Sequence, residues 1–356
     1  MGAYKVVRRP ECRKDEWNSA AEQFSSAWHW HKWDSIESML TWNGAIDHSF
    51  AVRSKADGER IICLCPLLLF PGSKPFSIFR SRLEATGGPA IDQNLSERAI
   101  NSLMHLVRVV LLEEADKTSV VIVDLSFPPL APAYVGGENR VNPAALIGCE
   151  DTSTHSWIVD LREHNQETLW QKIEHRSRKA VNKARRNGMV VRTASAQDLD
   201  AYLKLHRESC ARLGIPEKPA AYFQSIFTTH LEQGNALILA GCDADGTVHA
   251  LHTFAIAKGA ALYWTVASDE IAMQLGLNNL VQWEAMVRFL DMGLSFYENG
   301  EAFPGYQSGK LKRISDFKKG FGADLHPYFR GTLITREVVY ASIQLAKAIL
   351  RKRGQE

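Results

Sequence analysis

The sequence lacks an apolar run long enough to cross a membrane. Its longest apolar stretch, Ile61–Phe70, is ten residues long and contains Pro66, whereas a membrane-spanning helix needs about 20 apolar residues. The first residues lead directly into charged sequence, without the apolar core or the cleavage site of a secretory signal. We therefore expect a cytoplasmic protein.

Paired cysteines and a large net charge are also missing. The six cysteines are scattered along 356 residues, and Cys63 and Cys65, the closest pair, lack a second Cys or His pair at zinc-finger spacing. His249 and His252, three apart on a predicted strand, point to opposite faces and cannot share a metal. With a net charge of +2, bulk electrostatics do not favour a polyanionic partner. We expect free thiols, no bound metal and no tightly bound cofactor.

The length and composition favour two globular domains. A chain of 356 residues exceeds the size at which one hydrophobic core stops growing, and 45% hydrophobic with 23% charged residues is typical of soluble proteins. Between residues 129 and 154 the sequence is rich in Pro, Gly, Asn and Ala, which indicates a linker. We predict domains at 1–150 and 151–335, followed by an amphipathic helix at 336–356.

The two halves show a similar order of elements. The patterns in the first half predict helices at 16–24, 28–40 and 96–114, and strands at 50–53, 60–70 and 119–125, the first two joined by a turn at Asp57-Gly58. The second half is predicted to have helices at 167–187, 197–213, 220–233 and 277–292, and strands at 189–193, 236–242, 248–256, 261–266 and 294–298. This order predicts an α/β (α+β) fold in which each domain has a mixed, mostly antiparallel sheet flanked by helices.

Three segments of the second half occur in an informative order. They are the basic stretch 178–188, the stretch from Asn278 to Gly300, and Phe317-Lys318-Lys319-Gly320-Phe321-Gly322. Together they resemble the FemAB-like and BioF2-like branch of the GNAT acyltransferase superfamily over residues 155–330, and the last matches its F-K-x-x-F-G signature. The first half matches loosely, through 66–70 and 86–89.

The resemblance implies tandem GNAT-like domains and an N-acyltransferase. Such an enzyme moves an acyl or aminoacyl group from acyl-CoA or aminoacyl-tRNA, as co-substrate, onto an amine of a cell-envelope or exopolysaccharide precursor. One alternative is an aminoacyl-tRNA-dependent transferase acting on a protein N-terminus or a lipid. Another is a non-catalytic GNAT-like module that binds and scaffolds. The partners are then the acceptor and, where it is the donor, tRNA.

Glu298 and Lys318 are the catalytic candidates that the resemblance implies. Acyl transfer to an amine needs a base and a donor aimed at the developing oxyanion. Glu298 is predicted at a strand end beside aromatic residues, where desolvation would raise its pKa and suit a base; a salt bridge to Lys310 or Lys312 is the alternative. Lys318 would bind a carboxylate or phosphate or polarise the acyl carbonyl, unless it is a surface lysine beside two aromatic residues.

The substrate-binding candidates fall into two groups. On the basic helix, Lys179, Lys183 and Arg186 share one face and form either a phosphate-binding edge or a solvated surface. The other candidates are Phe317, which the helical spacing to Phe321 also permits as a core residue, Tyr263 and Tyr306.

The co-substrate loop is degenerate. GNAT enzymes that use coenzyme A carry an R/Q-x-x-G-x-G/A loop, whereas this chain has Met273-Gln274-Leu275-Gly276-Leu277-Asn278. Gly276 and Asn278 are the co-substrate-binding candidates, and the donor stays open. The long helical arm of some relatives is not expected, because the helices at 197–213 and 220–233 are short.

The C-terminal segment 336–356 has an apolar helical face that ends in Arg351-Lys352-Arg353. It either packs on the first domain or contacts the inner face of the membrane peripherally.

Overall fold

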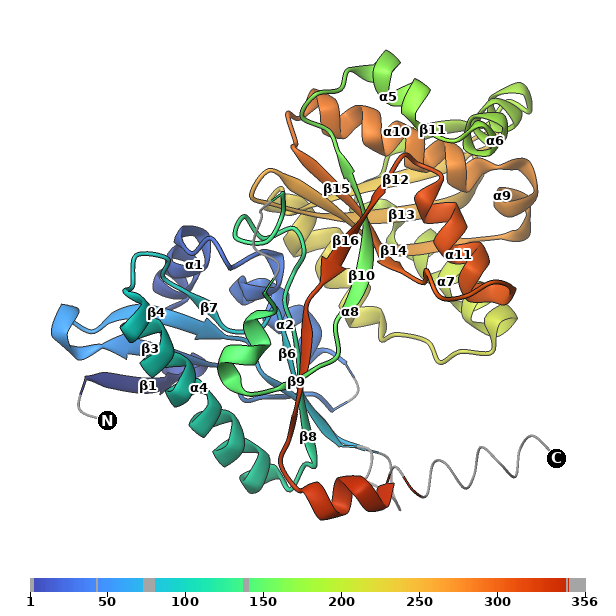
Figure 1. Cartoon of the computed structure of the whole chain (residues 1–356). Helices are drawn as coiled ribbons and strands as arrows, with labels where there is room; N and C mark the ends of the chain where they lie inside the picture. The colour runs from blue at the N-terminus through green and yellow to red at the C-terminus, as the bar shows by residue number, and fades with distance from the viewer. Residues whose placement is uncertain (1–2, 43, 73–80, 137–140, 344, 346–356) are drawn as a thin grey trace. The chain divides into compact units, whose positions relative to one another are not determined.

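The computed structural model describes residues 3–42, 44–72, 81–136, 141–343 and 345 (Figure 1). The chain forms two compact units: unit 1 comprises Met1–Thr154 and Tyr328–Glu356, and unit 2 comprises His155–Pro327. Residues 328–335, predicted in the second domain, thus belong to unit 1. The reason is strand pairing, since β17 (Arg330–Ile334) runs antiparallel to β8 (Ile122–Ser126) along its whole length.

Unit 1 has two sheets, with strand orders β1-β3-β4-β7 and β2-β5-β6-β8-β17-β9. Besides β8 and β17, its strands are β1 (Tyr4–Arg8), β2 (Ile46–Asp47), β3 (Phe50–Ser54), β4 (Arg60–Cys65), β5 (Leu68–Phe70), β6 (Arg82–Thr86), β7 (Ala90–Ile91) and β9 (Glu150–Asp151). Its helices include α1 (Lys14–Gln23), α2 (Trp33–Leu40) and α4 (Glu97–Thr118). One face of α4 is buried, and its residues Leu103, Val107 and Leu111 belong to the same core as the β8 residues Val123 and Leu125.

Two predicted elements of unit 1 are divided. The predicted strand 60–70 splits into β4 and β5 at Pro66, because proline has no N–H to donate to a ladder. The predicted helix 28–40 begins only at Trp33, because Lys32 is extended and separates α2 from the short 3-10 turn His29–His31. The hairpin turn is confirmed: β3 pairs antiparallel with β4, and Gly58 has a positive φ of 61°.

Unit 2 has one seven-stranded sheet of order β11-β12-β13-β14-β15-β10-β16. The strands are β10 (Thr154–Asp160), β11 (Val190–Thr193), β12 (Ala236–Cys242), β13 (Val248–Ala257), β14 (Ala260–Ser268), β15 (Phe296–Ala302) and β16 (Asp324–Tyr328). The helices are α5 (Gln166–Lys172), α6 (His175–Arg186), α7 (Leu199–Leu213), α8 (Ala220–Ser225), α9 (Glu270–Leu275), α10 (Leu277–Asp291) and α11 (Gly309–Lys319). In Figure 1, α6 and α10 cover one face of this sheet and α7 and α8 the other.

Two predictions in unit 2 are wrong in their bounds. The predicted helix 167–187 is two helices, because Ile173 and Glu174 are extended between α5 and α6. Arg178 spans this break and donates to the backbone carbonyls of Trp170 and Ile173. The predicted strand 294–298 extends to Ala302, because β15 pairs antiparallel with β10.

Both units repeat one arrangement. In each, a long helix lies in the connection between two parallel neighbouring strands: α4 between β6 and β8 in unit 1, and α10 between β14 and β15 in unit 2. In each, the next strand in the sheet is antiparallel, β17 or β10. The predicted class, mixed sheets flanked by helices in two similar domains, is confirmed.

The C-terminal segment is only partly described. Residues 337–343 are helical, and Val338, on the predicted apolar face, is 81% exposed. The predicted helix beyond 345, with Arg351-Lys352-Arg353, lies outside the described residues. Within the described ranges, no helix is both long and apolar enough to span a bilayer.

Candidate functional site

The sheet of unit 2 opens between β14 and β15. These parallel strands pair at three positions, ending at Leu262 and Glu298, although β14 continues to Ser268 and β15 to Ala302. A register shift stands on the far side of each strand, where β14 meets β13 and where β15 meets β10. Such bulges bend a strand and increase its twist. The two strands therefore separate beyond Leu262.

A cavity of about 560 Å³ lies at this opening. It is formed by α7, β14, β15, α11 and the segment before α10. Its lining residues are Ser209, Arg212, Leu213, Tyr263, Trp264, Val266, Ser268, Met273, Asn299, Lys310, Arg313, Ile314, Phe317 and Lys318. Three of the predicted site residues, Tyr263, Phe317 and Lys318, are thus brought together from segments more than fifty positions apart.

Lys318 lies near the end of α11 and is partly buried. Its Nζ donates to the backbone carbonyl of Glu301 at 2.9 Å. Burial lowers the pKa of Lys318, while the negative charges of Glu298 and Glu301 act in the opposite direction. The neighbouring Phe317 packs against the core, and its ring lies 5.3 Å from the fully buried ring of Phe321. The aromatic pair therefore anchors α11 and holds Lys318 at the cavity.

Glu298 lies in the interior of β15 and not at a strand end, which corrects the prediction. Its side chain is 4% exposed and accepts a hydrogen bond from Ser156 Oγ at 2.5 Å. It is not one of the residues that line the cavity. Lys312, one of the salt-bridge partners considered for it, forms an ion pair with Asp316 at 2.7 Å. Its negative charge acts to raise the pKa of Lys318, which does line the cavity.

Asn299 is a site residue that the sequence interpretation missed. It is fully buried, lines the cavity and donates from Nδ2 to the backbone carbonyl of Lys318 at 3.1 Å. The following Gly300 has a φ of 90°, and a Cβ there would stand 3.1 Å from Lys318 Nζ. A side chain at position 300 would crowd the ammonium group. The Glu298-Asn299-Gly300 sequence is the signal that could have identified this contact.

A chain of buried polar side chains connects α10 to the sheet. His252 is fully buried, and its Nε2 donates to Asn278 Oδ1 at 2.9 Å while its Nδ1 accepts from Gln282 Nε2 at 3.3 Å. Gln282 Oε1 accepts from the hydroxyl of Tyr297. Burial lowers the pKa of His252 to about 4, so its imidazole is neutral at pH 7. The side chain of Asn278, a predicted co-substrate contact, thus faces this chain of hydrogen bonds; its Nδ2 donates to Ser268 Oγ at 3.3 Å.

Gly276 links α9 to α10 with a φ of 79°. A Cβ at this position would lie 2.6 Å from the carbonyl oxygen of Ala180 on α6, so only glycine permits this approach. No side chain caps the start of α10, and Lys183 Nζ donates to the carbonyl of Gln274 at 2.7 Å. Backbone N–H groups at a helix start attract anions, and a lysine beside them reinforces that field.

The remaining candidates lie elsewhere. Lys179, Lys183 and Arg186 are exposed on α6 and do not line the cavity. Tyr306 is 53% exposed and contacts the ring of Phe303. The histidine interpretation agrees with the structure, since His249 bonds to Asp243 and Asp269, away from His252. The part of the chain that the structure describes contains no group of three potential metal ligands.

Comparisons with known proteins agree with this fold. The FemAB family model matches residues 146–261. The structure is similar to FemX, with a TM-score of 0.66 at 14% identity, covering 95% of this chain and 99% of FemX. It is also similar to a tandem GNAT protein from the clavulanic acid biosynthesis pathway (TM-score 0.53, 12% identity, 94% and 99% covered). The structure of L-PGS from Bacillus licheniformis gives 0.55 at 13% identity, with 88% and 96% covered. A search of curated sequences gave no match.

The predicted resemblance to the FemAB family is confirmed by the family model over residues 146–261. The structural similarities confirm the predicted tandem GNAT-like fold.

Proposed function

We propose that the cavity at the opening between β14 and β15 is the site where an acyl or aminoacyl group is transferred to an amine. The observation that carries the proposal is the divergence of these strands with Lys318 at the cavity wall. At the opening, the backbone groups of the strand edges lie beside a partly apolar space. Such an environment suits the binding of an acyl carbonyl. The FemAB-like resemblance favours an acceptor amine on a cell-envelope or exopolysaccharide precursor.

The reaction needs no covalent enzyme intermediate. The amine nitrogen forms a bond to the acyl carbon, the bond from that carbon to the sulfur or oxygen of the donor breaks, and the amine proton goes to the leaving group or to solvent. We assign to Lys318 the stabilisation of the negative charge that develops on the carbonyl oxygen. The negative charge of Glu298 favours the protonated form of Lys318 and so opposes the effect of burial on its pKa.

The donor carries phosphate in either form considered, acyl-CoA or aminoacyl-tRNA. The start of α10 has no side-chain cap and stands beside Lys183, which supports a phosphate contact there. The exposed Lys179 and Arg186 extend this positive edge along α6. These features suit acyl-CoA and aminoacyl-tRNA equally well. Experiment must therefore distinguish the two donors.

The test is transfer of radiolabel by the purified chain. Labelled acyl-CoA and aminoacyl-tRNA are each incubated with amino sugars and amine-bearing envelope precursors, and with a peptide N-terminus and an aminolipid as alternative acceptors. We expect label on an envelope or glycan amine, and loss of it in the Glu298→Gln variant. Absence of transfer from every donor, with donor binding retained, would instead identify a non-catalytic binding module.

A further inference from the structure

The cavity at the β14–β15 opening is lined by cations and by no carboxylate. Arg212 comes from α7, and Lys310, Arg313 and Lys318 come from α11. The fourteen lining residues include neither Asp nor Glu. A group that enters this cavity therefore meets positive charge on two sides.

Across the described ranges, three of these cations, Arg212, Lys310 and Arg313, form no ion pair with a carboxylate. All three are exposed, so water screens part of their charge. Arg212 is held in place by hydrogen bonds from its Nη2 to the backbone carbonyl of Ser268 at 2.9 Å and to Ser209 Oγ at 3.4 Å. Carbonyl and hydroxyl oxygens orient the guanidinium but do not cancel its charge. The field inside the cavity is accordingly positive.

The rest of the lining is apolar. Leu213, Val266, Met273 and Ile314 supply aliphatic surface, and Tyr263, Trp264 and Phe317 supply aromatic surface. Apolar lining binds apolar groups by removing their surface from water. A cationic side chain would lose hydration in such a space and would also be repelled by the four neighbouring cations.

We propose that this cavity receives acyl groups whose side chain is apolar and uncharged, and that it rejects acyl groups with a cationic side chain, such as lysyl. The inference rests on the proposed function and names the substrate class of the same site. Selectivity arises from repulsion against the wrong group as much as from contact with the right one. The cations of the lining also tolerate an acidic group.

The first test measures the cavity without any chemistry. Octanoate, octanamide and octylammonium have the same chain length and differ in charge, and their binding to the full chain is measured by isothermal titration at pH 7 and constant ionic strength. We expect octylammonium to bind at least about tenfold more weakly than octanamide, since like charges in a partly buried site repel. Equal or tighter binding of octylammonium would overturn the inference.

Charge reversal at the cavity sharpens this test. Arg313→Glu should narrow the difference in binding affinity between octanamide and octylammonium, because it adds a carboxylate to the lining. Arg207, on α7, is also exposed but does not line the cavity, so Arg207→Glu is the matched control and should leave the order unchanged. If both variants changed the affinities equally, the net charge of the protein, and not the cavity, would determine the order of affinity of the probes. That result would overturn the inference.

The second test uses transfer and separates the two proposals. Leucyl and lysyl donors of the same kind are compared at equal concentration, and leucyl transfer should be at least about tenfold faster. Faster lysyl transfer would refute the substrate class while leaving the acyltransferase proposal intact. Absence of transfer from any donor would refute the proposed function, whereas the order of the three alkyl probes would still decide what the cavity accepts.

Discussion

Both units contain a parallel strand pair that a helix connects, but the extent of pairing between the two strands differs. In unit 1, β6 and β8 stay paired at four positions, from Leu83 with Val123 to Thr86 with Ser126. In unit 2, β14 and β15 pair at three positions and then separate around a cavity. The sheet of unit 1 is therefore closed where that of unit 2 is open, and this difference supports our proposal that the transfer site lies in unit 2.

The helices that connect these strands differ in the same sense. In unit 1, α4 starts with Ser96, whose hydroxyl accepts a hydrogen bond from the N–H of Ala99 at 3.3 Å. Such a cap satisfies one of the N–H groups that would otherwise bind an anion. In unit 2, α10 starts after Gly276 without a side-chain cap. At the start of α4 a side chain of the chain itself satisfies one N–H group. At the start of α10 no side chain does so, and the N–H groups remain available to an anion.

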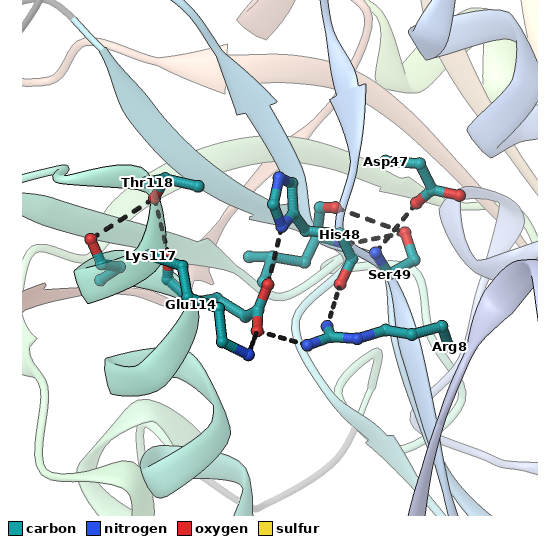
Figure 2. A network of polar contacts seen from close by, with 9 residues as sticks. Arg8, Asp47, His48, Ser49, Glu114, Lys117 and Thr118 are labelled. Carbon is teal, nitrogen blue, oxygen red and sulfur yellow. Dashed lines mark hydrogen bonds and ion pairs between the residues drawn. The ribbon is translucent and has the colours of Figure 1, made fainter.

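The buried polar groups of the two units differ in charge. In unit 1, Figure 2 shows Glu114 of α4 surrounded by Arg8, His48 and Lys117. Burial alone would raise the pKa of Glu114, but hydrogen bonds from Lys117, at 2.7 Å, from His48, at 2.7 Å, and from Arg8 lower it to about 2. In unit 2, by contrast, the buried imidazole of His252 is neutral at pH 7.

The largest effect is expected from Lys318→Ala. Loss of a group that stabilises an oxyanion lowers kcat by about 10²–10³, so transfer should fall by that factor with little change in stability. Lys319→Ala is the control, because Lys319 is exposed and does not line the cavity. Steady-state kinetics of both variants check the prediction. If Lys319→Ala lowered kcat as much as Lys318→Ala, the assignment of Lys318 would be wrong.

The next effect concerns Gly276→Ala. The added Cβ would meet the carbonyl of Ala180 at 2.6 Å at a positive φ, and we expect a loss of about 2–5 kcal/mol in unfolding free energy. Gly259→Ala is matched, because Gly259 also has a positive φ, 71°, but nothing within 4 Å of the new Cβ; it should lose only about 1 kcal/mol. Urea denaturation gives both values. Equal losses of unfolding free energy in the two variants would mean that α6 does not pack tightly against Gly276.

A smaller effect is expected from Glu114→Gln in unit 1. The amide has one acceptor oxygen and cannot accept from Lys117, His48 and Arg8 at once, and we expect a loss of about 2–3 kcal/mol. Glu113→Gln, at the adjacent exposed position, should change stability by less than about 0.5 kcal/mol. Thermal unfolding at pH 7 measures both, and transfer activity per folded molecule should be unchanged. A loss of activity beyond the loss of folded protein would show that unit 1 takes part in the chemistry.

The sequence predicted individual helices, strands and turns better than it predicted which strands pair with each other. The Asp57-Gly58 hairpin and the strand 236–242 follow from turn residues and apolar patterns, and both are present. The break at Ile173 was missed because helical periodicity continues across it. The position of Glu298 within β15 depends on β10, a strand more than a hundred residues away, and no local pattern encodes that partner.

The candidate site was predicted in part for the same reason. Phe317 and Lys318 were found through a motif. The Asn299 side chain bonds to the backbone carbonyl of Lys318, and the only sequence signal for this contact is the Glu298-Asn299-Gly300 segment. His252 was correctly separated from His249, but its partner Gln282 lies on α10, thirty positions away. Contacts made by packing distant segments need the fold before they can be seen.

The smallest effect is a difference between the units in how they respond to acid. An unfolded histidine has a pKa near 6.5, and that of His252 in the folded chain is about 4. Between these values the unfolded state binds more protons, so stability is present above about pH 6.5 and is lost as the pH falls toward 4. For Glu114, whose ordinary pKa is 4.5 and whose folded pKa is about 2, the loss of stability occurs between those two lower values. Acid should thus weaken unit 2 before unit 1.

Hydrogen–deuterium exchange, corrected for intrinsic rates, measures the two units separately. Between pH 7 and pH 5 the opening free energy of the α10 segment of unit 2 should fall by about 2 kcal/mol because of His252, while that of the α4 segment in unit 1 should change little. His252→Gln, which keeps hydrogen-bonding groups but cannot titrate, should remove most of the fall. His105→Gln, at an exposed position on α4, is the control and should leave it in place. If the fall persisted in His252→Gln, the acid sensitivity of unit 2 would arise from its other histidines, and the contrast of a neutral with a charged buried group would no longer explain it.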